Sequence, residues 1–150
     1  MRMTRQCDYA LVVLVSLAGR ENERMSCAEM ARELSIPLHF LAKILQKLCR
    51  AGLVASREGS GGGYYLARAP ATITVADVLR ATDEPVRLVE CAEGDDCGCP
   101  RLLVCAIVES MQALHRKVTA IFQEVTIADL IPLASRQVRA TSPMPGRVAQ

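Results

Sequence analysis

The sequence predicts a mainly α-helical fold: a winged helix-turn-helix with a small β-hairpin wing and a long C-terminal dimerisation helix. Three observations predict it. Two short helical patterns meet at a tight link around Pro37, four glycines lie between two short apolar runs, and a regular apolar stripe follows further along the chain. With 150 residues, 51% of them hydrophobic, the chain is large enough for one domain with a real core. Since it has three Tyr, two Phe and no Trp, that core must be aliphatic.

The first two helices are predicted from their end signals. Residues 4–19 form a helical pattern in which Thr4 is the N-cap and Gly19 ends the helix in the left-handed conformation. Ser26 begins a second helix over about residues 27–34. Ser26 and Glu29 have the spacing of a capping box, in which each side chain satisfies a free backbone N–H.

A third helix is predicted from Pro37 to Gly52. Apolar side chains recur along it at spacings of three and four, at Phe40, Leu41, Ile44, Leu45 and Leu48. Its other face exposes His39, Lys43, Gln46, Lys47 and Arg50, and this stretch contains no Asp or Glu. A helix that enters the major groove needs hydrogen-bonding groups and no repulsion from phosphate, whereas the alternative interpretation is an ordinary solvated face.

A β-hairpin is predicted directly after this helix. Residues 53–56 and 64–67 suit strands, and the four glycines lie in the turn over residues 57–63. The glycines allow positive φ angles or let the backbone approach a phosphate closely. A nucleotide-binding loop is the rival interpretation, but no Lys-Ser/Thr pair ends the glycine run. We therefore interpret the hairpin as a wing, followed by a short helix over residues 72–82.

A long helix is predicted from about residue 101 to residue 126. Its apolar residues step by three and four over three heptads, at Val104, Ile107, Met111, Leu114, Val118, Ile121 and Val125. This is the pattern of a coiled-coil seam. A helix of this length spans roughly 36 Å, which is long for so small a domain. We expect it to pair with a second copy of the chain; the alternative is a core helix without a partner.

The charge distribution and the absence of an export signal bear on partner and compartment. Residues 1–68 hold ten Lys/Arg against six Asp/Glu, whereas residues 91–134 hold three against six, so the first part suits a polyanion. The most apolar run, residues 9–18, is about half as long as a membrane span, and no signal peptide precedes it. We expect a cytoplasmic protein without a membrane partner, whose seven thiols lie in a reducing compartment.

Four cysteines lie within fifteen residues, at Cys91, Cys97, Cys99 and Cys105. Clustered thiolates bind zinc or the iron of iron–sulfur clusters. The gaps of five, one and five residues form an open loop and fit a zinc ribbon poorly, so an iron–sulfur cluster is favoured. Zinc and a thiol–disulfide switch remain open as alternatives. The other three cysteines occur singly in helical patterns and are predicted to be packing residues: Cys7, Cys27 and Cys49.

Motifs spread along the chain carry a family resemblance. They are Met1-Arg2-Met3-Thr4, Asp8-Tyr9-Ala10-Leu11, Ile36-Pro37-Leu38-His39-Phe40-Leu41, Leu45-Gln46-Lys47-Leu48, Ala51-Gly52-Leu53-Val54 and Gly59-Ser60-Gly61-Gly62-Gly63-Tyr64. With the downstream cysteines they resemble the Rrf-type bacterial transcription regulators of the IscR and NsrR kinds, over about residues 1–130. The resemblance implies a homodimer on a pseudo-palindromic double-stranded DNA operator, with three cysteines per subunit holding a 2Fe–2S or 4Fe–4S cluster.

The chain departs from that family pattern in several places. It has four cysteines where the family has three, so either Cys97 or Cys99 matches the second ligand. The family's histidine near the third cysteine is absent, since the nearest is His115. The resemblance instead implies that Asp8, donated across the dimer, could be the fourth ligand; its alternative role is a charge at a helix N-terminus. Alternatively, all four cysteines ligate within one subunit. Glu58 also stands in the wing where arginine is common.

These observations predict a DNA-binding transcriptional repressor regulated by an iron–sulfur cluster, without enzymatic activity or a small-molecule substrate. The rival class is a metal or cluster carrier that does not bind DNA. The expected regions are the DNA-binding region (residues 1–84), the cluster-binding loop (85–100), the dimerisation helix (101–130) and a disordered tail (131–150). The predicted metal ligands are Cys91, Cys97, Cys99, Cys105 and Asp8. The predicted DNA contacts are Arg2, Arg5, Ser26, His39, Lys43, Lys47, Arg50, Arg57, Ser60, Gly61, Gly62 and Tyr64.

Overall fold

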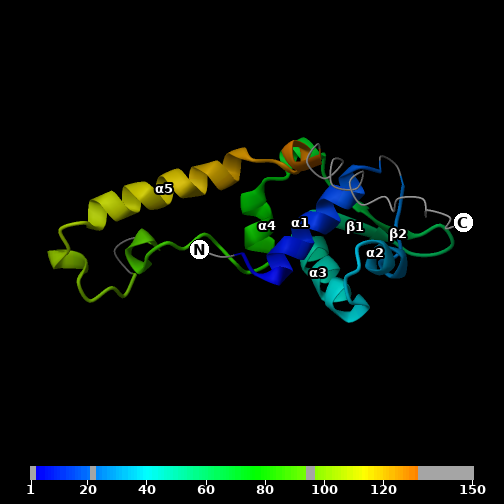
Figure 1. The fold of residues 1–150 in the computed structure, drawn as a ribbon, viewed down its shortest axis with the longest axis horizontal. Helices are drawn as coiled ribbons and strands as arrows, with labels where there is room; N and C mark the ends of the chain where they lie inside the picture. Colours follow the sequence, from blue (N-terminus) through cyan, green and yellow to red (C-terminus); the bar gives the residue numbers. More distant parts are fainter. Residues whose placement is uncertain (1–2, 21–22, 94–96, 132–150) are drawn as a thin grey trace, which may run out of the picture.

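The computed structural model describes residues 3–20, 23–93 and 97–131 (Figure 1). Its α-helices are α1 (Arg5–Ala18), α2 (Cys27–Glu33), α3 (Leu38–Arg50), α4 (Val75–Ala81) and α5 (Val108–Glu124). Its strands are β1 (Val54–Arg57) and β2 (Gly63–Leu66), and short 3₁₀ turns cover Pro70–Thr72, Glu90–Glu93 and Leu102–Val104. Figure 1 shows α1 to α4 and the hairpin packed together, while α5 extends away from them. The mainly helical winged helix-turn-helix prediction is confirmed.

Of the two predicted ends of α1, the structure confirms only the N-terminal one. The Thr4 side chain accepts a hydrogen bond from the Cys7 N–H at 3.4 Å, as the predicted N-cap. Gly19, however, has φ −74°, so the predicted left-handed end is wrong. Gly19 N–H bonds to the Val15 carbonyl at 3.1 Å and Arg20 N–H bonds to Leu17 at 3.2 Å. These bonds satisfy the last carbonyls in a right-handed turn, so a positive φ is not needed.

The helix-turn-helix follows from local signals. The Ser26 hydroxyl accepts from Glu29 N–H at 3.2 Å and Ser26 N–H donates to the Glu29 carboxylate at 2.8 Å, which confirms the capping box. Pro37 is the N-cap of α3. Gly52 has φ +69° and Leu53 N–H reaches back to the Leu48 carbonyl at 3.0 Å, so this glycine ends α3 in the left-handed conformation.

The wing is an antiparallel pair with a third segment on its edge. Its register pairs Val54 with Leu66 and Arg57 with Gly63. Met25, which precedes α2, bridges Tyr64 through two bonds: Met25 N–H to the Tyr64 carbonyl at 3.2 Å, and Tyr64 N–H to the Met25 carbonyl at 2.8 Å. The link between the first two helices therefore positions the wing.

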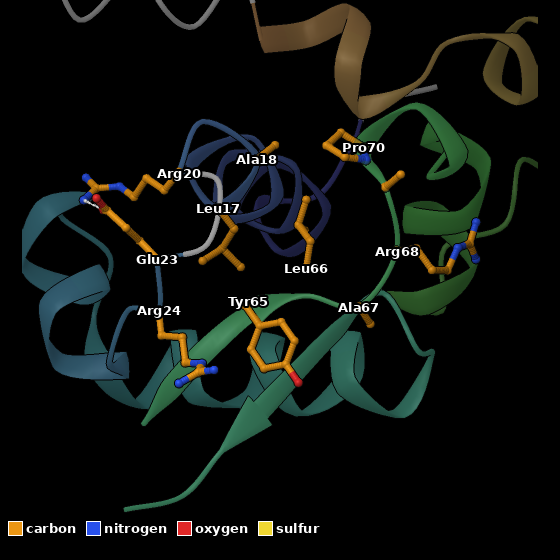
Figure 2. A pocket seen from close by; sticks show the side chains of 11 residues that line it. Leu17, Ala18, Arg20, Glu23, Arg24, Tyr65, Leu66, Ala67, Arg68 and Pro70 are labelled. Atoms are coloured by element: carbon orange, nitrogen blue, oxygen red, sulfur yellow. Dashed lines mark ion pairs between the residues drawn. The ribbon is translucent and has the colours of Figure 1, made fainter. Parts of the chain in front are cut away.

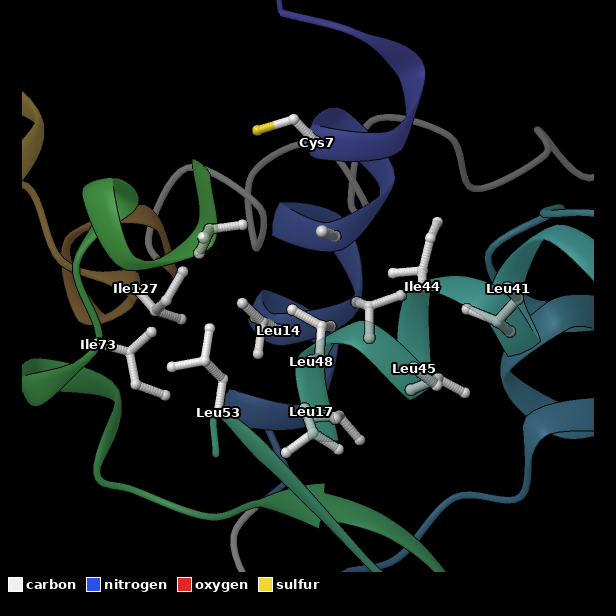
Figure 3. Packing of buried hydrophobic residues seen from close by; sticks show 14 of the residues in the cluster. Cys7, Leu14, Leu17, Leu41, Ile44, Leu45, Leu48, Leu53, Ile73 and Ile127 are labelled. Carbon is white, nitrogen blue, oxygen red and sulfur yellow. The ribbon is translucent and has the colours of Figure 1, made fainter. Parts of the chain in front are cut away.

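The core lies between α1, α3, α4 and the start of β1 (Figure 3). Its largest buried side chains include Leu14, Met30, Leu41, Ile44, Leu45, Leu48, Leu53, Ile73 and Ile127. Ile127 belongs to a helical turn after α5, and its N–H bonds to the Ile73 carbonyl at 2.9 Å. The chain thus returns from α5 to the core, which anchors the base of that helix.

The long helix is shorter than the sequence predicts. It begins at Val108, not near residue 101, and has 17 residues, about 25 Å at 1.5 Å per residue. Val104 lies in a 3₁₀ turn and Cys105 has extended dihedral angles, φ −82° and ψ 113°, which interrupt the helical hydrogen-bond ladder. The chain turns there, and the earlier turn Glu90–Glu93, which contains Cys91, packs against α5. The predicted disordered tail lies almost wholly outside the described residues, which end at Ile131.

Candidate DNA interface and cysteine site

The outer face of α3 is exposed and carries no acid. Its buried face packs Leu41, Ile44, Leu45 and Leu48 into the core, as the three-and-four spacing predicts. The opposite face leaves four polar or basic side chains in solvent: His39, Lys43, Gln46 and Arg50. This face therefore presents donors and positive charge on a rigid element, which is what major-groove recognition requires.

Lys47 lies at the edge of that face and already has a partner. Its ammonium is 2.8 Å from the Asp83 carboxylate and 3.5 Å from the Thr82 carbonyl. The hydrogen bond and charge of Lys47 hold the pKa of the Asp83 carboxyl below its ordinary value. The sequence predicted a phosphate contact for Lys47; in this structure the side chain bridges α3 to the end of α4.

The remaining predicted contacts fall into two groups. Arg5, Arg57, Ser60 and Gly61 are exposed at the start of α1 and along the wing, and Gly62 is partly exposed. Ser26 and Tyr64 have structural roles. The Ser26 hydroxyl is engaged in the capping box, and Tyr64 packs against the core, where burial raises the pKa of its phenol. Arg2 lies outside the described residues.

One residue near the wing was missed by the sequence reasoning. Arg24 donates from Nη1 to the Gly61 carbonyl at 3.3 Å, and its guanidinium carbon lies 5.7 Å from the centre of the Tyr65 ring. Figure 2 shows both side chains beside a cavity of about 660 Å³, between the end of α1 and β2. No short-range motif links Arg24 to the wing, because the two are 37 residues apart.

Two of the four clustered cysteines lie beside the first half of α5: Cys91 through its backbone, and Cys99 in a pocket that Val108 and Gln112 also line. All four thiols are free and partly buried, and the Gln112 side-chain amide donates to the Cys91 carbonyl at 2.9 Å. Burial raises the pKa of the Cys91 thiol, and the neighbouring thiols raise it further: Cys99, Cys97 and Cys105.

This donor set fits a soft metal or an iron–sulfur cluster by chemistry, since thiolates are the ligands such centres take. Within residues 3–20, 23–93 and 97–131, no three His, Cys, Asp or Glu side chains already converge on one point in a metal-binding arrangement. Binding therefore requires the thiols to draw together and lose their protons.

The two other ligand candidates occupy different elements. Asp8 is exposed in the first turn of α1, where a negative charge stabilises the helix dipole. His115 is partly buried on α5, with Nε2 3.5 Å from the Thr119 hydroxyl and Nδ1 without a hydrogen-bond partner among the described residues. The structure does not bring either residue into a converged set with the thiols.

A helix-turn-helix, an acid-free outer helix and a hairpin wing together define a winged-helix transcriptional regulator. Residues 3–132 match the family model Rrf2, described as an iron-dependent transcriptional regulator. The chain belongs to the Rrf2 family of transcriptional regulators, which bind DNA operators.

Individual relatives agree with this assignment. The transcriptional regulator NsrR of Geobacillus kaustophilus is 35% identical over 136 residues, which cover 87% of this chain and 90% of that protein. The regulator IscR of Cereibacter sphaeroides is 38% identical over 101 residues, 65% of each chain. The structure of CymR, the global cysteine regulator of B. subtilis, superposes with TM-score 0.68 and 25% identity over 89% of this chain and 98% of that one.

In residues 3–20, 23–93 and 97–131, no helix combines the length and the apolar character needed to cross a bilayer.

Proposed function

We propose that this chain is a homodimeric repressor whose affinity for a pseudo-palindromic operator is set by an iron–sulfur cluster. The sensor part is carried by four thiols within fifteen residues, Cys91, Cys97, Cys99 and Cys105, in a segment that Gln112 of α5 contacts at the Cys91 carbonyl. When bound, a 2Fe–2S or 4Fe–4S cluster supplies a centre that iron limitation, oxidants or nitric oxide can remove or alter.

The DNA-reading part of the proposal is supported by the surface of α3 and the wing. His39, Lys43 and Arg50 project from a helix whose opposite face is locked into the core, so they are presented rigidly. The glycine-rich wing tip leaves its backbone exposed for phosphate approach. A twofold dimer presents two copies of α3, and each copy binds its own half-site. We therefore expect the half-sites to be separated by one or more helical turns of DNA.

Dimerisation is supported by the apolar stripe that a single copy leaves exposed. Ile107, Leu114 and Ile121 are spaced by seven and are 59%, 46% and 57% exposed. The structure describes the whole of α5, and none of its side chains is fully buried in a single copy of the chain. A second copy of the same helix is the partner that a heptad stripe fits.

The cysteine segment (residues 90–105) and the dimer helix are coupled through a defined contact. Gln112 of α5 donates to the Cys91 carbonyl, so a rearrangement that moves the Cys91 backbone changes a bond to the proposed dimer helix. The helix in turn connects to the DNA-binding body through the Val75 N–H and the Val125 carbonyl, 2.9 Å apart. Cluster loss can thus alter the spacing of the two recognition helices.

The experiment is anaerobic purification followed by absorption spectroscopy and iron and sulfide analysis. We expect a coloured protein that loses iron in the variants Cys91→Ala and Cys105→Ala, and in only one of Cys97→Ala and Cys99→Ala. Cys27→Ala is the matched control, because Cys27 is a thiol on α2, at the start of the helix-turn-helix. A colourless, iron-free wild type would overturn the cluster proposal; bound zinc or a Cys–Cys disulfide in that protein would assign the alternative switches.

DNA binding needs its own measurement. A duplex selected from random sequence by the wild-type protein is titrated by fluorescence anisotropy at rising salt. We expect the logarithm of the affinity to fall steeply and linearly with the logarithm of salt concentration. A flat dependence, or no selected sequence, would favour the rival carrier class.

A further inference from the structure

We propose that Arg24, from the segment before α2, is a DNA-contact residue of the wing, held at the wing tip by Tyr65 and Gly61. The inference rests on the proposed function, because it presumes that the wing approaches DNA. It assigns a contact to a residue outside both the recognition helix and the hairpin.

The position of Arg24 is defined by two contacts to the wing. Its Nη1 donates to the Gly61 carbonyl at 3.3 Å, and its guanidinium lies over the Tyr65 ring, 5.7 Å from the ring centre. Figure 2 shows the Arg24 side chain directed toward the hairpin, with the Tyr65 ring beside it. The ring provides a face that attracts the cation, so the side chain is restrained although it is exposed.

The backbone beneath Arg24 is fixed as well. Met25 exchanges two backbone hydrogen bonds with Tyr64, which form an isolated antiparallel bridge on the edge of the wing. The approach is so close that a Cβ at Gly63 would lie 2.8 Å from the Met25 carbonyl atoms. The wing and Arg24 therefore form one unit and move together.

The charge of the wing tip, residues 57–62, explains why this arginine matters. Arg57 and Glu58 are its charged side chains, and they cancel. A tip with no net charge gains little from the phosphate field. Arg24 is the cation that the structure adds beside Gly61, so the assembled tip becomes positive.

The guanidinium also has donors left for DNA. It carries five N–H donors, and the Gly61 carbonyl takes one of them. Among the described residues, no carboxylate forms an ion pair with Arg24, unlike Arg20, Arg68 and Arg80. The remaining N–H donors lie in one plane and can bind two phosphate oxygens or base edges on the floor of a minor groove.

The experiment compares variants on the duplex selected by the wild-type protein, by anisotropy from about 50 to about 300 mM salt. We expect Arg24→Gln to weaken binding several-fold and to reduce the salt slope by about one. Arg24→Lys should keep the slope but bind more weakly, because the ammonium lacks the fork. Tyr65→Leu should also keep the slope and bind more weakly, because the arginine is no longer held.

Arg116→Gln is the matched control. It removes the same charge from an exposed position of α5, two residues after Leu114, on the side away from the apolar stripe. The inference is overturned if Arg24→Gln and Arg116→Gln reduce DNA affinity and its salt slope by the same amounts. It is also overturned if Arg24→Gln weakens binding without changing the salt slope, because Arg24 then only stabilises the wing. A wild type that selects no DNA would overturn the proposed function itself, so the two failures are distinguishable. Circular dichroism and thermal unfolding of each variant check that the fold is kept.

Discussion

The Lys47 ammonium lies 2.8 Å from the Asp83 carboxylate, and this ion pair joins α3 to the second residue after the end of α4. The next residue, Glu84, accepts hydrogen bonds from the backbone and hydroxyl of Thr4 at the start of α1. Residues 82–84 are therefore held from two sides, immediately before the chain runs to the cysteine segment. If α3 contacts DNA as proposed, this junction determines whether the Lys47 charge is free for a phosphate.

The first prediction concerns the release of Lys47. Asp83→Asn removes the negative partner, while asparagine tolerates the φ of +62° at this position. We expect tighter operator binding and a salt slope steeper by about one, because Lys47 becomes available to a phosphate. Anisotropy titrations at several salt concentrations measure both quantities.

The control for this prediction is Asp129→Asn, which changes the net charge equally at an exposed carboxylate in the helical turn after α5. If both variants strengthen binding by the same amount, the effect is general electrostatics and Lys47 has no specific part in it.

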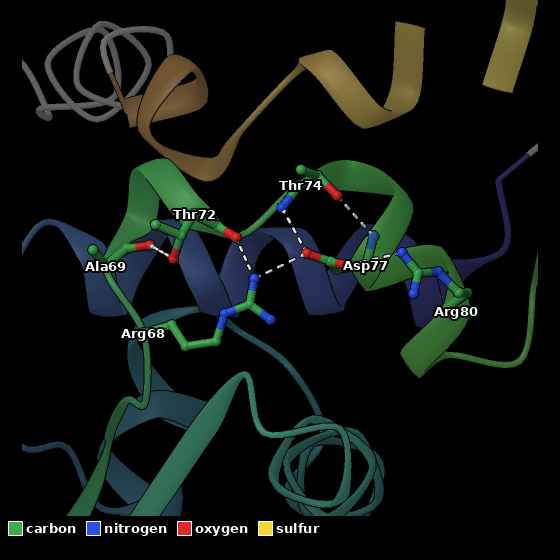
Figure 4. Close-up of polar contacts among 6 residues, drawn as sticks. All are labelled: Arg68, Ala69, Thr72, Thr74, Asp77 and Arg80. Atoms are coloured by element: carbon green, nitrogen blue, oxygen red, sulfur yellow. Dashed lines mark hydrogen bonds and ion pairs between the residues drawn. The ribbon is translucent and has the colours of Figure 1, made fainter. Parts of the chain in front are cut away.

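The second prediction concerns pH and the cap of α4 (Figure 4). Burial alone would raise the pKa of the Asp77 carboxyl, but the Thr74 N–H and the charges of Arg68 and Arg80 outweigh it, so the pKa is lowered. A lowered folded-state pKa means that this stabilisation is present above the unfolded pKa of about 3.9, and is lost as pH falls through the folded value.

We therefore expect Asp77→Asn to lower the free energy of unfolding by roughly 1 kcal/mol at neutral pH, the typical contribution of a cap. The difference from wild type should shrink below about pH 4. Urea unfolding at a series of pH values measures it. A difference that stays constant down to pH 3, or a similar loss in the exposed Glu58→Gln, would contradict the assignment.

The local parts of this fold could be predicted from the sequence because their causes are local. The Ser26–Glu29 capping box spans three residues, and Gly52 ends α3 with bonds to the turn just before it. The apolar spacing of α3 predicted its buried face for the same reason. Each of these features depends on residues within one or two helical turns of each other.

The features that could not be predicted depend on residues far apart in the chain. Lys47 meets Asp83 across 36 residues and Arg24 meets Gly61 across 37, so no window of sequence reveals either pair. The heptad pattern through Val104 suggested a helix, but the chain turns at Cys105 and packs against α5. The four clustered cysteines can be recognised in the sequence. Which of them bind the proposed cluster depends on how the thiols converge in three dimensions.

The third prediction tests the close contact between the wing and the segment before α2. Gly63 has φ +143° and an added Cβ would meet the Met25 backbone at 2.8 Å, whereas Gly61 has φ +75° and open space around it. Gly63→Ala should therefore destabilise the fold by several kcal/mol, and Gly61→Ala by only about 1 kcal/mol of backbone strain. Thermal unfolding compares the two variants directly. Equal losses would show that Met25 and the wing are not packed as closely as described.

The last prediction tests the exposed stripe of α5. Ile121→Glu places a carboxylate in the proposed seam, at a side chain that is 57% exposed in one copy. Burial of an unpaired charge in an interface costs roughly 3 kcal/mol or more, so dimer affinity should fall at least about a hundred-fold. Gln123→Glu adds the same charge to an exposed position of α5 two residues further on, and should leave the dimer intact.

Sedimentation velocity at micromolar concentration separates the two forms. Because Ile121 is exposed, the Ile121→Glu chain should keep the wild-type helical signal as a monomer, and its operator affinity should fall because each half-site is then bound alone. If Ile121→Glu remains a dimer, the α5 stripe is not the seam. If the wild type sediments as a monomer, the homodimer proposal itself is wrong.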